Sequence, residues 1–249
     1  MIDFHCHLDL YKDPLSILPE VEKRCEFVLA VTTSPRAWAT TSIKFKHIST
    51  VRTAIGLHPE ILLNRIDELK ALLNGVKLNR FIGEVGIDGS HQYSGSLDLQ
   101  KKVFHEILLE SEQCGGRILS IHSRNAATEV LDIIERHCSK SIPIMHWFSG
   151  SFDELERAKE LGVWFSINPI MTFSDKGVDV ISRLPLSSIL PETDGPFTQK
   201  NGVPYMPWDT SIVINHLAKV FGETDKSIEV KVRHNLDNLI NSFRYDRTT

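Results

Sequence analysis

Eight short apolar segments alternate with segments of helical periodicity, and this alternation restricts the possible folds more than any other feature of the sequence. The apolar segments are rich in Val, Ile, Leu and Phe, and most lack polar–apolar alternation, which is typical of parallel strands buried on both faces. They occupy residues 2–7, 27–32, 53–57, 80–88, 118–122, 142–146, 163–167 and 188–194. One strand in about every thirty residues predicts an α/β fold, a TIM-like (β/α)8 barrel.

The segments between the strands agree with this prediction. Apolar residues recur at helical spacing over residues 15–25, 36–45, 66–73, 97–114, 126–137 and 153–161, and residues 211–243 read as two further helices. Gly115 and Gly116 follow the longest of these patterns, where a helix C-cap belongs. A doubly wound open sheet is the alternative fold, but no Gly-x-Gly-x-x-Gly motif follows the first strand. No linker-like run divides the chain, so we expect one barrel domain over residues 1–249.

The composition is that of an ordinary globular protein. The 249 residues are 41% hydrophobic and 24% charged, and the formal net charge of -4 argues against broad coating of duplex nucleic acid. The four cysteines are scattered without a Cys-x-x-Cys motif, so we expect reduced thiols and no disulfide framework. Neither a signal peptide nor a membrane-spanning apolar run is evident, and we expect a cytoplasmic protein that does not contact membranes.

Polar residues stand at or near the C-terminal ends of six of the expected strands. In a closed barrel these ends all face one mouth, which is where barrel enzymes carry out their chemistry. Taken singly, each residue could be a hydrogen-bonded rim side chain, but their common position favours metal binding. We call this set the strand-end cluster, and its members are His5, His7, His58, Glu84, His122, His146 and Asp194.

Six members of the strand-end cluster form a plausible ligand set of four imidazoles and two carboxylates. Without thiolates, such a set suits zinc, manganese or another divalent ion such as magnesium better than a structural cysteine site. Six ligands are too many for one open catalytic ion and about right for two ions that share a carboxylate. Two dications would make the mouth locally positive, which favours an anionic substrate such as a phosphodiester. The six are His5, His7, Glu84, His122, His146 and Asp194.

Six motifs resemble those of one known family. They are Asp3-Phe4-His5-Cys6-His7-Leu8-Asp9, Gly56-Leu57-His58-Pro59, Gly83-Glu84-Val85-Gly86-Ile87-Asp88, His122-Ser123-Arg124, His146-Trp147-Phe148-Ser149-Gly150-Ser151 and Glu192-Thr193-Asp194-Gly195-Pro196. In this order they resemble the TatD family of metal-dependent deoxyribonucleases, within the amidohydrolase-like metallohydrolases. The resemblance implies a TIM-like barrel and 3′-to-5′ cleavage of DNA, often single-stranded.

The resemblance also implies how the two divalent ions would be held. His5 and His7 would bind the first ion, and His122 and His146 would bind the second. Glu84 would bridge the two ions, and it would therefore belong to the catalytic machinery as well as to the ligand set.

The same resemblance implies roles for the residues around the ions. Asp194 would bind metal and act as the catalytic base that orients the attacking water. His58 and Arg124 would contact the phosphate of the substrate, although Arg124 could also be a solvated cation at the rim. Asp88 would sit past the barrel rim and only order a loop.

Two departures from the family pattern flank the expected mouth. The usual Arg-Asn-Glu-Pro run after the eighth strand is missing, with residues 200–204 near its place, and the loop at 89–91 lacks the usual aromatic residue. These variations and the compact size resemble the TatD-like nuclease of Qat anti-phage defence systems, which implies other defence proteins as partners. Five aromatic residues could stack unpaired bases near the mouth or pack in the core: Trp147, Phe148, Phe197, Tyr205 and Trp208.

Two other functions compete with a DNA nuclease. The same centre could hydrolyse another ester or an amide, for example the ester of an aminoacyl-tRNA. Alternatively, the barrel could be a binding module within a defence complex, but a pure scaffold has no need of six metal ligands. The sequence alone does not distinguish a DNA nuclease from a hydrolase of another ester or an amide.

Overall fold

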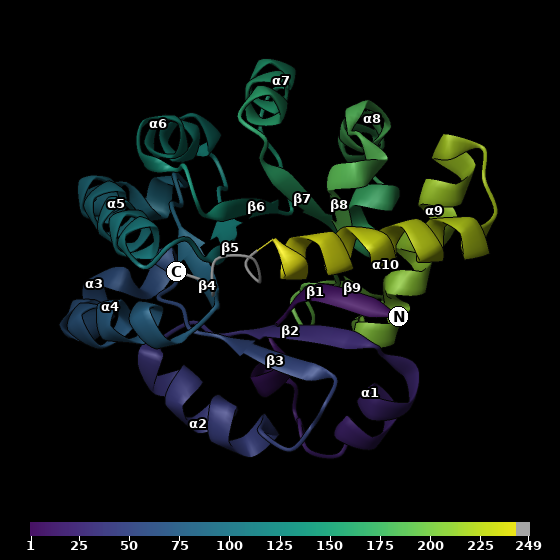
Figure 1. Ribbon diagram of the computed structural model, residues 1–249, viewed down its shortest axis with the longest axis horizontal. Coiled ribbons are helices and arrows are strands. Elements are labelled where there is room, and N and C mark those ends of the chain that lie inside the picture. Colours follow the sequence, from purple (N-terminus) through teal and green to yellow (C-terminus); the bar gives the residue numbers. More distant parts are fainter. Residues whose placement is uncertain (243–249) are drawn as a thin grey trace.

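Eight parallel strands follow one another in chain order in the computed structural model, which describes residues 1–242 (Figure 1). They are β1 (Ile2–Cys6), β2 (Phe27–Val31), β3 (Val51–Ala54), β4 (Phe81–Gly86), β5 (Ile118–His122), β6 (Ile142–His146), β7 (Trp164–Ile167) and β8 (Ile189–Pro191). Hydrogen bonds arrange them as a three-stranded sheet in the order β1-β2-β3 and a five-stranded sheet in the order β4-β5-β6-β7-β8. A short antiparallel pair, β9 (Gln199–Lys200) with β10 (Val203–Pro204), lies in the segment after β8.

Backbone contacts on both sides join the two sheets into a closed barrel. Ile55, just after β3, forms a parallel bridge with Ile82 of β4. On the other side, the Asp194 amide donates a hydrogen bond of 2.8 Å to the carbonyl oxygen of His5, which ties the end of β8 to β1. The predicted TIM-like barrel is therefore confirmed, and its closure brings the ends of the first and last strands to the same mouth.

Ten α-helices are found in residues 1–242, and most of them surround the strands (Figure 1). They are α1 (Leu18–Arg24), α2 (Pro35–Phe45), α3 (Leu62–Arg65), α4 (Leu69–Leu78), α5 (Leu97–Gln113), α6 (Ala127–His137), α7 (Phe152–Glu160), α8 (Asp175–Arg183), α9 (Ser211–Phe221) and α10 (Asp225–Asn241). Local sequence signals set several of their ends. Ser151 and Glu154 form a reciprocal capping box before α7, and Gly222 ends α9 in the left-handed conformation at φ 66°.

The observed elements differ from the predicted ones at several places, and the strands β3, β4 and β8 end two or three residues before the predicted ends. Helix α8 was not predicted, because its nine residues are mostly polar and include Gly177 in the first turn. A β-carbon at Gly177 would lie 2.3 Å from the Met171 carbonyl oxygen, so this glycine serves close packing. Helix α4 begins at Leu69 after a 3-10 turn, and β3 begins two residues before the expected strand. Phe243, the expected end of the last helix, lies outside the described residues.

The first strand is anchored by aromatic packing next to its histidines. Phe4, which is fully buried, stacks on Phe27 of β2 with ring centroids 5.7 Å apart, and Phe81 of β4 meets Phe4 edge-on at 6.4 Å. Because Phe4 and His5 are adjacent in a strand, their side chains point to opposite sides. This packing therefore holds His5 in a fixed direction.

The remaining features of the fold concern its cysteines and its surroundings. All four cysteines are free, and burial raises the pKa of the Cys25 and Cys138 thiols to about 12, which keeps them protonated. In residues 1–242, no helix has the length and apolar character needed to span a bilayer.

Candidate metal centre

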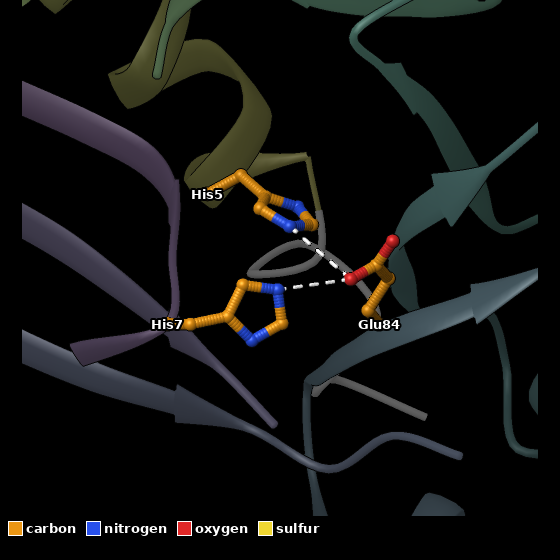
Figure 2. Close-up of side chains that lie close together, drawn as sticks. All are labelled: His5, His7 and Glu84. Carbon is orange, nitrogen blue, oxygen red and sulfur yellow. Dashed lines mark hydrogen bonds and ion pairs between the residues drawn. The ribbon is translucent and has the colours of Figure 1, made fainter. Parts of the chain in front are cut away.

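Glu84 lies at the middle of the strand-end cluster, and five imidazoles surround its carboxylate. Oε2 of Glu84 is 3.0 Å from Nε2 of His7 and 3.5 Å from Nε2 of His5, and Figure 2 shows both rings directed from β1 toward this carboxylate. Oε1 faces the other three rings, at 3.1 Å from His58 Nε2, 2.8 Å from His122 Nδ1 and 2.9 Å from His146 Nε2. The two oxygens of one buried carboxylate thus serve two separate groups of imidazoles.

Asp194 supplies a second carboxylate beside the first group. Its Oδ1 is 3.5 Å from His5 Nε2 and 3.7 Å from His7 Nε2. The backbone at Asp194 turns with φ 53°, a left-handed conformation that Asp tolerates better than most residues. Burial raises the pKa of Asp194 to about 7, and the negative charge of Glu84 adds to this shift while His146 and His7 oppose it.

Several ring nitrogens of the cluster have no hydrogen-bond partner within residues 1–242. They are Nε2 of His5, Nδ1 of His7 and Nδ1 of His146, all of them buried. In His7 and His146 the other ring nitrogen, Nε2, faces Glu84, so the indication of an ion comes from His5 Nε2. A buried polar atom without a partner is costly, and a bound cation would remove that cost for the lone pair of His5 Nε2. His5 Nε2 has a carboxylate oxygen at 3.5 Å on each side, one from Glu84 and one from Asp194. The donor set therefore fits divalent cations.

Four groups of donors in residues 1–242 have the spacing of metal ligands, with donor atoms that all lie within 4.8 Å of one another. Two of them lack Glu84 and consist of His5, His146 and Glu192, and of Glu60, Asp88 and His122, whereas Glu84 belongs to the other two. One group consists of His5, His7 and Glu84, and the other of His58, Glu84 and His122. His146 joins the second group through its Nε2, which lies as close to Glu84 Oε1 as the others do.

His58 differs from the other four imidazoles in the state of its ring. Its Nδ1 accepts a hydrogen bond of 3.2 Å from the Glu60 backbone amide, which can only donate. In the neutral ring the proton must then lie on Nε2, the nitrogen that points to Glu84. A protonated Nε2 is a hydrogen-bond donor and not a metal ligand, so this contact favours a substrate-binding role for His58.

The charges in the cluster shift one another's pKa values strongly. Burial alone would raise the pKa of Glu84, but the electrostatic effect of the neighbouring His58 and His146 rings and the hydrogen bond with His122 hold it well below its usual value. Burial lowers the pKa of His5, and the charge of His146, whose ring stacks on it at 3.9 Å, adds to this effect. Contacts with carboxylates outweigh burial and raise the pKa of His7, His122 and His146. The metal-free cluster thus favours an ionised Glu84 and a neutral His5, and metal binding at the other rings would displace protons.

Two carboxylates to which the sequence analysis assigned no role contact residues of the strand-end cluster and their neighbours. Glu192 is fully buried, accepts a hydrogen bond of 3.2 Å from the Trp147 amide and places Oε1 3.7 Å from Nδ1 of His146. Asp3, also fully buried, accepts hydrogen bonds from the backbone amides of His5 and Thr193 at 3.2 Å and 2.9 Å. A carboxylate inside an otherwise apolar strand was the signal that could have identified both.

Asp88 lies in a different place from the one expected. It does order a loop, since its Oδ1 accepts a hydrogen bond of 2.8 Å from the Ser90 amide. The expectation that it lies past the rim and has no other role is wrong, because it is fully buried and its Oδ2 lies 2.7 Å from Nε2 of His122. The position of Asp88 was not foreseen because β4 ends at Gly86, and the residues after it run alongside the end of β5 in space.

A cavity of about 570 Å³ opens over the cluster. Arg124, which is exposed, lines it together with Trp147 and Phe197. Phe197 is 59% exposed and meets the His7 ring edge-on at 5.0 Å. The cavity wall therefore has an exposed guanidinium group and two aromatic rings next to the candidate metal ligands.

The other three aromatic candidates do not line this cavity. Phe148 is buried and packs edge-on against Phe165 at 5.7 Å, which makes it a core residue. Tyr205 is also buried, and its carbonyl oxygen accepts a hydrogen bond of 2.5 Å from the Tyr11 hydroxyl. Trp208 stacks under the guanidinium of Arg24 at 4.6 Å. Trp147 and Phe197 remain as the candidates for stacking an unpaired base.

Comparison with known proteins gives concordant results. The family model for TatD-related DNases matches residues 2–241. The chain is 26% identical over 258 residues to human "Deoxyribonuclease TATDN3", with 95% of this chain and 93% of the relative covered. It is 26% identical over 217 residues to Escherichia coli "Uncharacterized metal-dependent hydrolase YjjV", with 83% of each chain covered.

Solved structures share the same fold. The crystal structure of YjjV, described as a TatD homologue from Escherichia coli K12, has a TM-score of 0.86 to this chain at 24% identity and covers 96% of this chain and 97% of its own. A TatD family hydrolase from Entamoeba histolytica has a TM-score of 0.75 at 14% identity, again with 96% and 97% of the two chains covered.

Proposed function

Because the chain belongs to the TatD-related DNase family of metal-dependent hydrolases, we propose that it cleaves phosphodiester bonds of DNA with two divalent ions bound on either side of Glu84. The observation that carries this proposal is the division of the Glu84 carboxylate, whose two oxygens face two different groups of imidazoles. One ion bound to Glu84 would meet only one of these groups of imidazoles, whereas two ions sharing the carboxylate would use both groups.

The first ion would be held by His5, His7, Asp194 and Glu84. Three of these atoms, His5 Nε2, Asp194 Oδ1 and Glu84 Oε2, lie within 3.5 Å of a neighbour in the set. The second would be held by Glu84 with Nδ1 of His122 and Nε2 of His146. Nitrogen-rich ligands of this kind favour zinc or manganese over magnesium. When bound, the ions would polarise the phosphoryl oxygens and activate the attacking water.

Asp194 would act as the base. Its carboxylate lies beside the His5 and His7 rings, where it can orient the attacking water and accept its proton. Its backbone is fixed through the amide hydrogen bond to His5, so the carboxylate keeps its direction during the reaction.

His58 and Arg124 would hold the scissile phosphate. His58 keeps a proton on Nε2 because its Nδ1 already accepts the Glu60 amide, and this N–H lies 3.1 Å from Glu84 Oε1 beside the cavity. With Glu84 engaged by the ions, the N–H would be free to donate a hydrogen bond to a phosphate oxygen. Arg124 is exposed at the cavity wall, where its guanidinium can meet a second oxygen of the same group.

The proposed substrate form is a single strand or a frayed end, cleaved from 3′ to 5′. A duplex about 20 Å wide would have to approach ions seated inside a barrel mouth, whereas one strand can enter. The acidic chain offers no broad cationic track for a duplex, which normally binds through many phosphate contacts. Trp147 and Phe197 at the cavity wall could stack the terminal base.

The test is a time course on one 5′-labelled DNA strand, free and annealed as a blunt duplex, at fixed Mn²⁺ and salt. We expect products that shorten progressively from the 3′ end, formed faster from the free strand, and at least about a hundredfold slower with Glu84→Gln. Faster degradation of the blunt duplex contradicts the proposed substrate form. Cleavage of neither form, with hydrolysis of an aminoacyl ester or an amide instead, would replace the nuclease proposal with the other hydrolase.

A role in anti-phage defence remains a prediction of the sequence resemblance. It depends on the segments around the mouth, in which the β9–β10 hairpin stands where the family's usual motif is missing. Expression of the chain with its neighbouring genes, with and without Glu84→Gln, should lower phage plaque counts only with the intact centre. Equal plaque counts would contradict this role and leave the nuclease proposal unaffected.

A further inference from the structure

The segment around Asp88 is pinned to the end of β5 on both sides. The Ile87 amide donates a hydrogen bond of 3.0 Å to the carbonyl oxygen of His122, and the Gly89 amide donates one of 2.8 Å to that of Arg124. Gly86 permits this close approach, since a β-carbon there would lie 2.1 Å from the His122 carbonyl oxygen. Asp88 is thus fixed beside the strand that carries His122.

The support of Asp88 extends into helix α5. Its backbone amide donates a hydrogen bond of 2.7 Å to Oε1 of Gln100, which is fully buried on that helix. Nε2 of Gln100 in turn donates to Oγ of Ser96 at 2.8 Å. These contacts use the backbone of Asp88, so they leave its carboxylate available for another purpose.

The two carboxylate oxygens of Asp88 have different partners. Oδ1 accepts the Ser90 amide, which is sufficient to order the loop. Oδ2 lies 2.7 Å from Nε2 of His122, a contact that ordering the loop does not need. Because an ionised carboxylate only accepts hydrogen bonds, Nε2 of His122 must carry a proton. Nδ1 faces the Glu84 carboxylate at 2.8 Å, so an ion bound there would replace the proton on Nδ1 while Nε2 keeps its proton toward Asp88.

We propose that Asp88 is a positioning residue that fixes the tautomer and the direction of the His122 ring, so that Nδ1 is presented to a divalent ion shared with Glu84. This inference rests on the proposed function, because it takes His122 as a ligand of the second ion. Without an acceptor at Nε2, a neutral imidazole divides between two tautomers and its ring turns more freely, and both effects weaken metal binding.

The tautomer can be measured directly on protein loaded with Zn²⁺, which is diamagnetic. Two-dimensional ¹H–¹⁵N correlation of the imidazole nitrogens in the loaded protein reports which nitrogen of each ring carries the proton. We expect His122 to carry it on Nε2, with the assignment made by loss of its signals in His122→Gln. A proton on Nδ1, or an equal mixture of both forms, overturns the proposal.

Metal binding provides the second measurement. Titration calorimetry with Mn²⁺ should give about two ions per wild-type chain, with one of them bound about 10- to 100-fold more weakly in Asp88→Asn. The control is Gln100→Met, which removes the hydrogen bond to the Asp88 backbone and keeps the carboxylate, and we expect its affinities to stay within about threefold of wild type. Equal affinities in wild type and Asp88→Asn, or an equal loss in both variants, overturn the positioning role.

The two measurements also separate this inference from the function on which it rests. If wild-type protein binds no metal ion, the dinuclear centre fails and the positioning role of Asp88 fails with it. If wild-type protein binds two ions and the variants do not differ, the centre stands and the role of Asp88 fails.

Discussion

The carboxylate of Glu112 connects three elements of the barrel at some distance from the candidate metal centre. It sits in the last turn of α5 and accepts hydrogen bonds from the amides of Ser139, Lys140 and Ser141 at 3.0, 2.8 and 2.7 Å, and from the Ser139 hydroxyl at 2.8 Å. Oγ of Ser141 then accepts the Arg117 amide at 3.1 Å, just before β5. The segment held in this way leads into β6, the strand that ends at His146.

Replacing Glu112 by Gln removes the charge and one of the two acceptor oxygens. If the amide oxygen takes the place of Oε2, which accepts three hydrogen bonds, the new NH₂ group faces the amide of Ser141, and two donors oppose each other. An unpaired donor of this kind costs about 1–3 kcal/mol, and the bonds that remain lose their charge assistance. We expect Glu112→Gln to lower the free energy of unfolding by about 2 kcal/mol, or the melting temperature by about 4–8 °C in a chain of this size.

This loss should depend on pH in a defined direction. Burial alone would raise the pKa of Glu112, but the hydrogen bonds from Ser141 and Ser139 outweigh it and hold the pKa below its usual value. A carboxyl group whose pKa is lower in the folded state stabilises the protein fully above its unfolded pKa of about 4.3, and this contribution disappears as the pH falls through the folded value. The difference between wild type and Glu112→Gln should therefore be largest near pH 7 and shrink below about pH 4.

Urea unfolding followed by circular dichroism at several pH values measures these differences. The matched control is Glu106→Gln on the same helix, because Glu106 makes only a weak pair with Lys102 at 4.0 Å in the described part of the chain. Its effect should stay within about 0.5 kcal/mol. The reasoning would be refuted by equal effects of the two substitutions, or by an effect of Glu112→Gln that is the same at pH 7 and pH 3.

Three further predictions concern the centre. Elemental analysis after saturation with Zn²⁺ or Mn²⁺ should find about two ions per chain and fewer than one in Glu84→Ala, whereas a constant single ion in wild type excludes a dinuclear site. Asp194→Asn should reduce turnover at least about a hundredfold with an unchanged circular dichroism spectrum, and activity near that of wild type would remove Asp194 from the mechanism. Phe197→Ala should raise KM for single-stranded DNA about 5- to 100-fold, while Phe173→Ala, at a phenylalanine with a similar exposed fraction outside the cavity, should leave it unchanged; equal changes would argue against stacking by Phe197.

The sequence was sufficient to predict the barrel because each of the eight predicted apolar runs overlaps one of the eight strands, although β3, β4 and β8 end before their runs do. The predicted bounds of β5 and β6 match the structure to the residue, since in each an apolar run stops at a histidine that turns toward the mouth. Helix α8 escaped prediction because its stability depends on packing: Gly177 fits against the Met171 carbonyl group, a contact that no local pattern reveals. Periodicity reports burial along one segment and carries no information on which other segment provides the contact.

The residues that support the cluster could not be predicted for the same reason. Glu192, Asp3 and Asp88 each follow from the sequence as charged residues near strand ends, but their roles depend on which atoms they meet across the barrel. Asp3 belongs to β1 and binds the amide of Thr193, while Asp88 follows β4 and meets a ring on β5. Both partners lie on neighbouring strands whose register the sequence does not specify.

The distinction between a ligand and a hydrogen-bond donor among the histidines depends on the ring nitrogen that faces away from Glu84. In His58 that nitrogen accepts a backbone N–H, so the neutral ring must present a proton to the cavity. In His122 it faces a carboxylate that holds its proton, which leaves the nitrogen toward Glu84 as the one that an ion would bind. His58 and His122 lie at similar distances from Oε1 of Glu84. We nevertheless expect His58 to donate a hydrogen bond to the phosphate and His122 to bind the ion. The sequence predicts both rings at the mouth of the barrel. Whether each ring donates a hydrogen bond or binds an ion depends on the partner of its other nitrogen, which the sequence does not reveal.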